Sequence, residues 1–290
     1  MRLSRGSNIL LRMGVGLTLA FIYVPLIVIA IYAFNASTTL AWPPPGFTLD
    51  WFGEAVDNPG AREAFLTSVQ VALIATAVAL ILGTLASLAV SRHRFFGRET
   101  ISFLVIIPIA LPGIVTGIAL NSTFSQVFGI DLSLFTVVVG HATFCIVVVY
   151  NNAIARLRRT SASFEEASAD LGADPWQTFR RVTLPNMRTA LVAGALLAFA
   201  LSFDEIIVTT FTIAAGEETL PIWFFNNFSR PNNLPIVNVV AVFVIVLSMI
   251  PVYIANRLSS EEAVGAAAGR GGRAQAPGGT AAAAEATAAP

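Results

Sequence analysis

Six long apolar runs divide the chain, and they constrain its fold more than any other feature of the sequence. A helix needs about 20 mainly apolar residues to cross a bilayer, and each run reaches that length. Only 12% of the 290 residues are charged, against about 25% in a soluble domain. The sequence therefore predicts an all-α membrane protein with six transmembrane helices. The runs are approximately Met13–Phe34, Phe65–Val90, Ile101–Asn121, Leu134–Ile154, Ala190–Ile213 and Ile236–Asn256.

The first run follows Arg2, Arg5 and Arg12, an arrangement that secretory signal peptides share. The apolar core of a signal peptide has about 7–15 residues, and this run is longer. We therefore expect a retained span, preceded by a tail at 1–12. The whole permeation domain is then expected at 13–256. The Ala- and Gly-rich stretch 257–290 lacks periodicity and is expected to be disordered.

The arginines predict the orientation of the spans. All 17 basic residues are arginine. Three precede the first run, three lie in Ser91–Thr100, six in Ala155–Thr189 and three in the C-terminal tail. The opposite side has only Arg62 and Arg230. Because cytoplasmic loops carry the excess of basic residues, we expect both termini and the segment 155–189 in the cytoplasm.

The residue types also exclude several functions. The chain has no lysine, which a Walker A phosphate-binding loop requires, so we expect no ATP or other cofactor bound by this chain. The single Cys145 cannot form a disulfide within the chain. The cysteine and the two histidines do not have the spacing of metal ligands. The sequence also has no recognisable arrangement of a nucleophile with a general base. We therefore expect neither an enzyme nor a metal site, and the bilayer rather than nucleic acid as a partner.

The loops between the runs carry further signals. The segment Asn35–Ala64 has a proline run and two tryptophans, and a short helix is expected near Leu49–Val56. A passive connector and a contact with a partner are both open for it. Another short amphipathic piece is expected within Thr212–Pro235. In the third run, Pro108 and Pro112-Gly113 predict a kink or break, and both gating and packing are open as its purpose.

The polar stretch Ser163–Met187 is the one interruption that has the pattern of a small structure. Ser163 and Glu166 form a capping-box pattern, which predicts the start of a helix. Gly172 is expected to end that helix in a left-handed conformation. Asp174 and Pro175 then suit the cap and first residue of a second helix, with Trp176 and Phe179 on its apolar stripe and Pro185 in its end region.

This stretch resembles the EAA loop of ABC-importer permeases, the inner-membrane components of binding-protein-dependent transport. The resemblance lies in Glu166-Ala167-Ser168, Gly172 and Val182-Thr183-Leu184-Pro185, with Ser168 and Val182 in place of the usual Ala and Ile. It implies a type I ABC importer permease fold and a bacterial cytoplasmic (inner) membrane location. The implied partners are an ATP-binding cassette ATPase dimer, a second homologous permease subunit and an extracytoplasmic substrate-binding protein. The implied ATPase-coupling residues are Glu166, Ala167, Gly172, Trp176, Phe179, Leu184 and Pro185.

Three ionisable side chains lie within the runs: His141, Asp204 and Glu205. Counting 1.5 Å per residue places His141 and Asp204 at similar depth in the outer half of the membrane. A carboxylate there costs about 2.5–3.5 kcal/mol, and two without a cationic partner suit a cationic substrate. The alternative is that a carboxylate caps backbone at a helix break. For His141, both a packing role and a place in the substrate pathway are open.

A narrower resemblance concerns the substrate. Five short segments resemble the spermidine/putrescine branch of these permeases, in particular its second permease subunit. They are Gly140-His141-Ala142-Thr143-Phe144, Asn151-Asn152, Ser202-Phe203-Asp204-Glu205, Glu218-Thr219-Leu220-Pro221 and Asn238-Val239-Val240. The resemblance implies ATP-driven import of a polyamine. Permeases for opines, other amines or iron share much of this pattern, and an ion-driven secondary transporter is the rival from another class.

Overall fold

The apolar runs form helices because a segment inside a bilayer has to satisfy its own backbone hydrogen bonds. The computed structural model describes residues 5–250 and 253, and within them no β-strand occurs. In chain order the helices are α1 (Arg5–Ala33), α2 (Asp50–Asp57), α3 (Pro59–Arg92), α4 (Arg98–Ala110), α5 (Gly113–Ser122), α6 (Leu134–Arg159), α7 (Ser163–Asp170), α8 (Pro175–Thr178), α9 (Leu184–Phe203), α10 (Ile207–Thr212) and α11 (Leu220–Phe228).

Two π-helical turns and one further helix complete this order. The turn η1 (Thr123–Val127) follows α5, and η2 (Phe179–Thr183) joins α8 to α9. A last apolar helix covers Pro231–Ile250 and begins with the 3₁₀ turn η3 (Pro231–Asn233). The end of the sixth predicted span and the predicted tail 257–290 lie outside the described residues.

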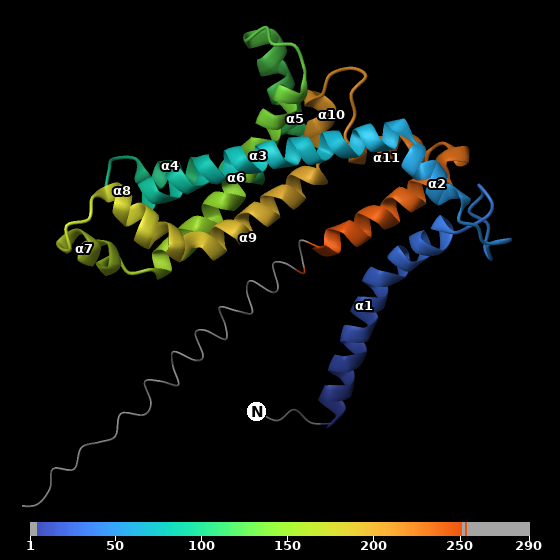
Figure 1. Cartoon of the computed structure of the whole chain (residues 1–290), viewed down its shortest axis with the longest axis horizontal. Helices are drawn as coiled ribbons and strands as arrows, with labels where there is room; N and C mark the ends of the chain where they lie inside the picture. Colours follow the sequence, from blue (N-terminus) through green and yellow to red (C-terminus); the bar gives the residue numbers. More distant parts are fainter. Residues whose placement is uncertain (1–4, 251–252, 254–290) are drawn as a thin grey trace, which may run out of the picture.

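Helices α3, α6 and α9 form the centre of the bundle and lie side by side (Figure 1). Helix α3 turns a row of small side chains toward its neighbours, among them the fully buried Ala72, Ala75 and Ala79. Gly83 continues this row, and a Cβ atom there would lie 3.0 Å from the Ile146 carbonyl oxygen and 3.0 Å from the Tyr150 amide nitrogen. Small residues let the backbones of α3 and α6 approach closely, which is how helices associate in membranes.

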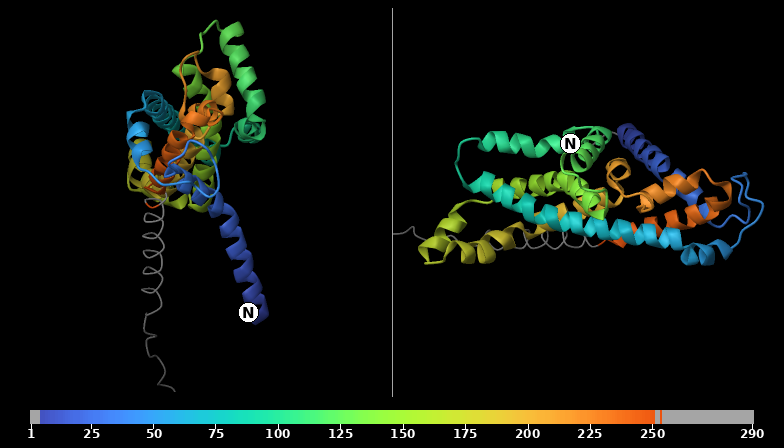
Figure 2. Two further views of the ribbon diagram at one scale, coloured as in Figure 1. Left: turned by 90° about the vertical axis from the view of Figure 1, so that its right-hand side faces the viewer. Right: turned by 90° about the horizontal axis from the view of Figure 1, so that it is seen from above.

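The two ends of the bundle hold different short helices. Helices α7 and α8 lie at one end, and α2 and α11 lie at the other (Figures 1 and 2). At the α11 end, the Ser68 hydroxyl of α3 accepts a hydrogen bond of 2.8 Å from the Leu220 amide. The short helices expected near Leu49–Val56 and within Thr212–Pro235 are therefore present as α2 and α11.

Two of the predicted spans are broken. Helices α4 and α5 meet at an angle of 102° at Leu111 and Pro112, so the expected break occurs at Pro112-Gly113, while Pro108 lies inside α4 without one. The fifth run was predicted as one span, with a helix break at its carboxylates as an open alternative, and the structure has the break. Helix α9 stops at Phe203 and α10 starts at Ile207, because the Glu205 carboxylate takes the Val208 amide that would otherwise continue the helix.

The two broken regions face each other. Helix α5 stands at a steep angle to the bundle with α10 beside it (Figure 1). Gly117 of α5 leaves room for the Phe211 ring, whose nearest carbon would lie 2.8 Å from an added Cβ. The side-chain amide of Asn121 donates a hydrogen bond of 2.7 Å to the backbone carbonyl of Phe211. The breaks in the third and fifth spans are therefore one packed unit.

The sequence predicted that the second helix of the polar stretch ends near Pro185, and this is wrong. The helix is continuous from Pro175 to Phe203. Pro185 lies inside this continuous helix and has no backbone N–H for a helical hydrogen bond. The turn before it is wider than an α-helical turn, since the Leu184 amide donates to the Phe179 carbonyl five residues back. The widened turn and the proline together let the chain pass from α8 into α9.

Helix α1 is separate from the bundle. It extends away from the other helices in two views at right angles (Figures 1 and 2), and none of its most apolar 18-residue window is buried. Leu17 is 76% exposed and Phe21 83% exposed. It begins at Arg5 rather than Met13, so its helix includes part of the predicted tail. Its apolar surface is left for lipid or for another chain.

Gly83→Ala should destabilise the α3–α6 contact, because the added methyl group meets backbone atoms that cannot rotate away. Overpacking of this kind costs about 1–3 kcal/mol. The matched control is Gly14→Ala in α1, where nothing lies within 4 Å. In thermal unfolding of the purified chain in detergent, Gly83→Ala should lower the midpoint and Gly14→Ala should not. Equal midpoints would contradict the close contact.

Candidate functional site

The first candidate site is the loop that contains α7 and α8. Helix α7 begins at Ser163, as predicted, but the predicted capping box is wrong: Ala162 is the cap residue and makes no side-chain cap. Instead, the Ser161 hydroxyl accepts a hydrogen bond of 3.2 Å from the Ser163 amide. Gly172 has a φ of +83°, as its place after the helix predicts.

The second helix of this loop begins as the sequence indicates. Asp174 is the cap of α8, and its Oδ1 accepts a hydrogen bond of 2.9 Å from the Gln177 amide. Pro175 is the first helical residue, where its fixed φ suits the helix. The angle between α7 and α8 therefore depends on the Gly172 turn and the Asp174 cap.

Helix α7 presents an apolar surface that the chain itself does not cover. Phe164 is 59% exposed and Leu171 is 90% exposed. Glu166 and Ala167, two of the predicted coupling residues, are exposed on the same short helix. Phe164 and Leu171 are seven residues apart, a spacing that places both side chains on one face of a helix.

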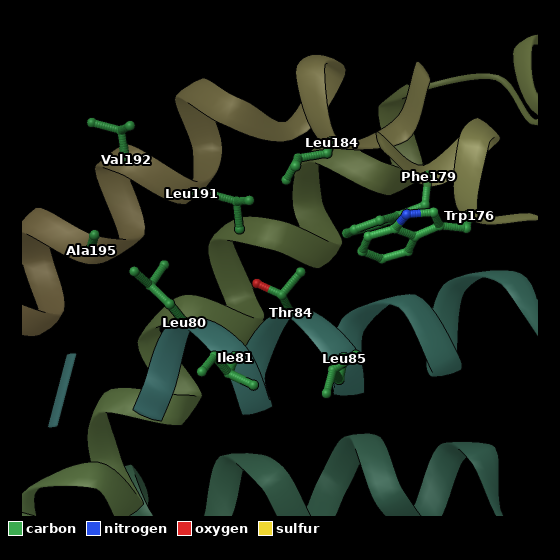
Figure 3. A pocket seen from close by; sticks show the side chains of 10 residues that line it. All are labelled: Leu80, Ile81, Thr84, Leu85, Trp176, Phe179, Leu184, Leu191, Val192 and Ala195. Atoms are coloured by element: carbon green, nitrogen blue, oxygen red, sulfur yellow. The ribbon is translucent and has the colours of Figure 1, made fainter. Parts of the chain in front are cut away.

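Trp176 and Phe179 follow in α8 and η2, and Trp176 is itself 66% exposed. Their rings stack with centroids 5.6 Å apart and an interplanar angle of 30°. They line a groove of about 560 Å³ between α3 and α9 (Figure 3). Leu184 also lines this groove, whereas Pro185 is exposed at the start of α9. The seven predicted coupling residues are therefore divided between an outer surface, the turn and the groove.

Sequence reasoning missed Glu165, the neighbour of the predicted Glu166. The Glu165 carboxylate forms an ion pair of 2.9 Å with the Arg92 guanidinium. It also accepts a hydrogen bond of 3.0 Å from the Thr183 hydroxyl. Arg92 lies 73 residues earlier in the chain, so no local spacing could have indicated this contact.

The second candidate site is the break between α9 and α10, and the side chain that spans it is His141 of α6. His141 is 1% exposed. Its Nδ1 lies 2.7 Å from the Ser202 hydroxyl oxygen, in the last turn of α9. Its Nε2 lies 2.8 Å from the Thr209 hydroxyl oxygen, in α10. One imidazole therefore joins both halves of the broken helix to α6.

The hydrogen bonds around His141 determine which ring nitrogen carries the proton. The Thr209 hydroxyl donates its single proton to the Glu205 carbonyl oxygen, 2.8 Å away. It can therefore only accept from the imidazole, so Nε2 is the donor. Nδ1 then accepts from the Ser202 hydroxyl. A neutral imidazole satisfies every partner in this cluster.

Asp204 and Glu205 have different surroundings at the break. Glu205 is half-buried, and its Oε1 accepts a hydrogen bond of 2.8 Å from the Val208 amide, which is the capping role considered for these carboxylates. Asp204 is exposed, and its side chain makes no hydrogen bond or ion pair within residues 5–250. The break therefore leaves one carboxylate without a partner among the described residues. The sequence predicted His141 at a depth similar to that of Asp204. In the structure, its ring contacts Ser202 before the two carboxylates and Thr209 after them.

Comparison with known proteins identifies the family. Residues 75–261 match the family model described as binding-protein-dependent transport system inner membrane component. The chain belongs to this family. It is a permease subunit of an ABC importer and a multi-pass membrane protein. The expected fold class is confirmed, with five helices long enough to span and a sixth span if the bent pair α4–α5 counts as one, by length and composition in the described residues.

Similar proteins cover most of the permease chain. The putrescine transport system permease protein PotI of Escherichia coli K12 is 33% identical over 78% of this chain and 82% of its own length. The spermidine/putrescine transport system permease protein PotC of Haemophilus influenzae is 32% identical over 79% of this chain and 88% of its own. A solved bacterial ABC transporter that imports the acidic polysaccharide alginate matches 90% of this chain and 99% of its own, with a TM-score of 0.66 and 18% identity.

Thr209→Val should destabilise the permease, because it removes the partner of the His141 Nε2 proton and of the Glu205 carbonyl. A buried polar group left without a partner costs about 1–3 kcal/mol. The matched control is Thr76→Val in α3, whose buried hydroxyl oxygen has no hydrogen-bond partner. Thermal unfolding in detergent should show a lower midpoint for Thr209→Val alone. Equal midpoints would exclude the proposed proton arrangement.

Proposed function

We propose that this permease is one of two homologous membrane subunits of an importer for a polyamine, putrescine or spermidine. The observation that carries the proposal is the likeness, at 32–33% identity over most of the chain, to permeases named for transport of these cations. The alginate transporter shows that the same fold also serves an acidic substrate. The fold therefore does not indicate the charge of the substrate, and the charged side chains along the proposed pathway have to be considered instead.

The carboxylates on the proposed outer side suit a cationic substrate. Nine of the 17 acidic residues lie within 35–64, 122–133 and 204–235, and these segments hold only two of the 17 arginines. An excess of one charge raises the local concentration of ligands with the opposite charge. Asp204 lies exposed at the break, where an ammonium group of the substrate would offset its charge.

The energy comes from a separate ATPase dimer that binds at α7. Helix α7 offers uncovered apolar side chains at the arginine-rich end of the bundle, which the distribution of charge assigns to the cytoplasm. The chain has no lysine for a Walker A loop, so ATP binds to the partner and not to this chain. The same charge rule assigns both termini to the cytoplasm.

The remaining partners account for the other uncovered surfaces. A second permease subunit and lipid cover α1, whose most apolar window is not buried by the described residues. An extracytoplasmic binding protein delivers the polyamine at the end of the bundle formed by α2 and α11. Movement of α7 by the ATPase then shifts α9 and its break between outward- and inward-facing states.

The proposal is tested by transport in proteoliposomes that contain the permease pair, the ATPase and the binding protein. ATP-dependent uptake of putrescine should require all four components. The variant Asp204→Asn should raise the KM for putrescine, and Asp131→Asn, an exposed outer carboxylate away from the break, should leave it unchanged. Uptake by the permease alone under an ion gradient would refute the proposal, and equal KM values would exclude Asp204 from the pathway.

Gly172→Val should uncouple ATP hydrolysis from uptake while membrane insertion stays normal. A β-branched residue at a φ of +83° strains the turn between α7 and α8 by about 1–2 kcal/mol. The matched control is Gly97→Val, which has a similar φ of +85° and open space around it, in the loop before α4. The ratio of uptake to hydrolysis should fall for Gly172→Val only, and a ratio equal to that of the control would refute the role of this turn.

A further inference from the structure

Helix α7 lies against the bundle with little apolar packing of its own. It has eight residues, and none of them is buried. Its main contacts are with α8 and with the π-helical turn η2. An isolated helix shorter than about 12–15 residues is marginal in water. The position of α7 therefore depends on the polar side chains that hold it.

One carboxylate joins α7 to two other elements. Arg92, the last residue of α3, donates from Nε to Glu165, with distances of 2.9 Å to Oε2 and 3.1 Å to Oε1. Thr183, the last residue of η2, donates from its hydroxyl to the same Oε1. The Thr183 side chain is buried, and the ion pair is 19% and 23% exposed. Glu165 therefore connects the end of α3, the start of α7 and the turn that leads into α9.

A second polar contact fixes α7 relative to α8. The hydroxyl oxygens of Ser168 and Thr178 lie 3.0 Å apart. Ser168 occupies the position where the EAA pattern usually has alanine, and alanine could not form this bond. The departure from the pattern therefore adds a link between the two short helices.

The two adjacent glutamates of α7 have different surroundings. Successive side chains on a helix point about 100° apart, so Glu165 and Glu166 cannot face the same surface. Glu166 is exposed on the proposed ATPase side. Glu165 is turned toward Arg92, in the one ion pair found within the described part of the chain.

We propose that Glu165 is a positioning residue that couples α7 to α3. Helix α7 is connected along the chain to α6 and α8, but α3 lies about 70 residues earlier and meets α7 through this carboxylate. A displacement of α7 reaches α3 through Arg92 and reaches α9 through Thr183. The inference rests on the proposed function, because it requires an ATPase that moves α7.

Charge reversal tests the link in the complete reconstituted transporter, with putrescine as the probe. Arg92→Glu and Glu165→Arg each place like charges together, and each should lower uptake per ATP hydrolysed about tenfold, a typical coupling between two sites. The double variant Arg92→Glu/Glu165→Arg restores opposite charges and should recover most of the loss. The control Arg94→Glu/Glu99→Arg exchanges two exposed charges of the same region and should leave the ratio unchanged.

A second measurement covers the case in which a single reversal fails to assemble. A nitroxide label on Leu171→Cys reports the motion of α7 in the isolated permease, since the native Cys145 is buried and Leu171 is 90% exposed. Glu165→Gln removes the charge and should increase the mobility of this label, while Glu99→Gln should not.

Two results would overturn the inference: single reversals that couple as well as the parent, or a double variant that recovers nothing while the label in Glu165→Gln is as immobile as in the parent. A parent complex that does not move putrescine refutes the proposed function instead. In that case the label alone decides whether Glu165 holds α7.

Discussion

Every backbone polar group inside a bilayer has to find its partner within the protein, and this constraint shapes the whole permease. Unbroken helices meet it locally, as α3 does over Pro59–Arg92. A broken helix meets it only if side chains replace the lost bonds. At the break after Phe203, Glu205 accepts from the Val208 amide and Thr209 donates to the Glu205 carbonyl. The interrupted fifth span is therefore stabilised by side chains that replace the lost bonds, and His141 joins its two halves to α6.

The features that could be predicted from the sequence are those with a local cause. Run length predicts the spans, Pro112 predicts the break in the third span, and Gly172 and Asp174 predict the turn and cap in the polar stretch. Each of these depends on residues within a few positions of one another. The break in the fifth span stayed one of two alternatives, because two carboxylates in an apolar run suggest a ligand as readily as a cap. Their spacing cannot distinguish a carboxylate that binds backbone from one that is exposed.

The candidate site depends more on contacts between distant segments, which a single sequence does not reveal. Glu165 and Glu166 look equivalent in the chain, and only the fold shows that one of them meets Arg92. Trp176, which the motif implies as a coupling residue like Glu166, stacks on Phe179 in the groove beside α3 and is 66% exposed (Figure 3). The motif predicted where the loop is and how it turns. It could not predict which side of the loop each residue occupies.

The surfaces that the chain leaves uncovered are consistent with a subunit and not with a self-sufficient transporter. Helix α1 buries none of its apolar window, and α7 with its cap residue exposes Phe164 and Leu171 at the arginine-rich end. Asp204 has no partner in the described part of the chain. An exposed helix in lipid is tolerable, but apolar side chains on a short polar-loop helix in water favour a protein partner. These three surfaces differ in chemistry, so one partner cannot cover them all. Lipid and a second permease suit α1, a soluble protein suits α7, and a passing cation suits Asp204. The proposed transporter, with separate partners for these three surfaces, is consistent with the surfaces that this chain leaves uncovered.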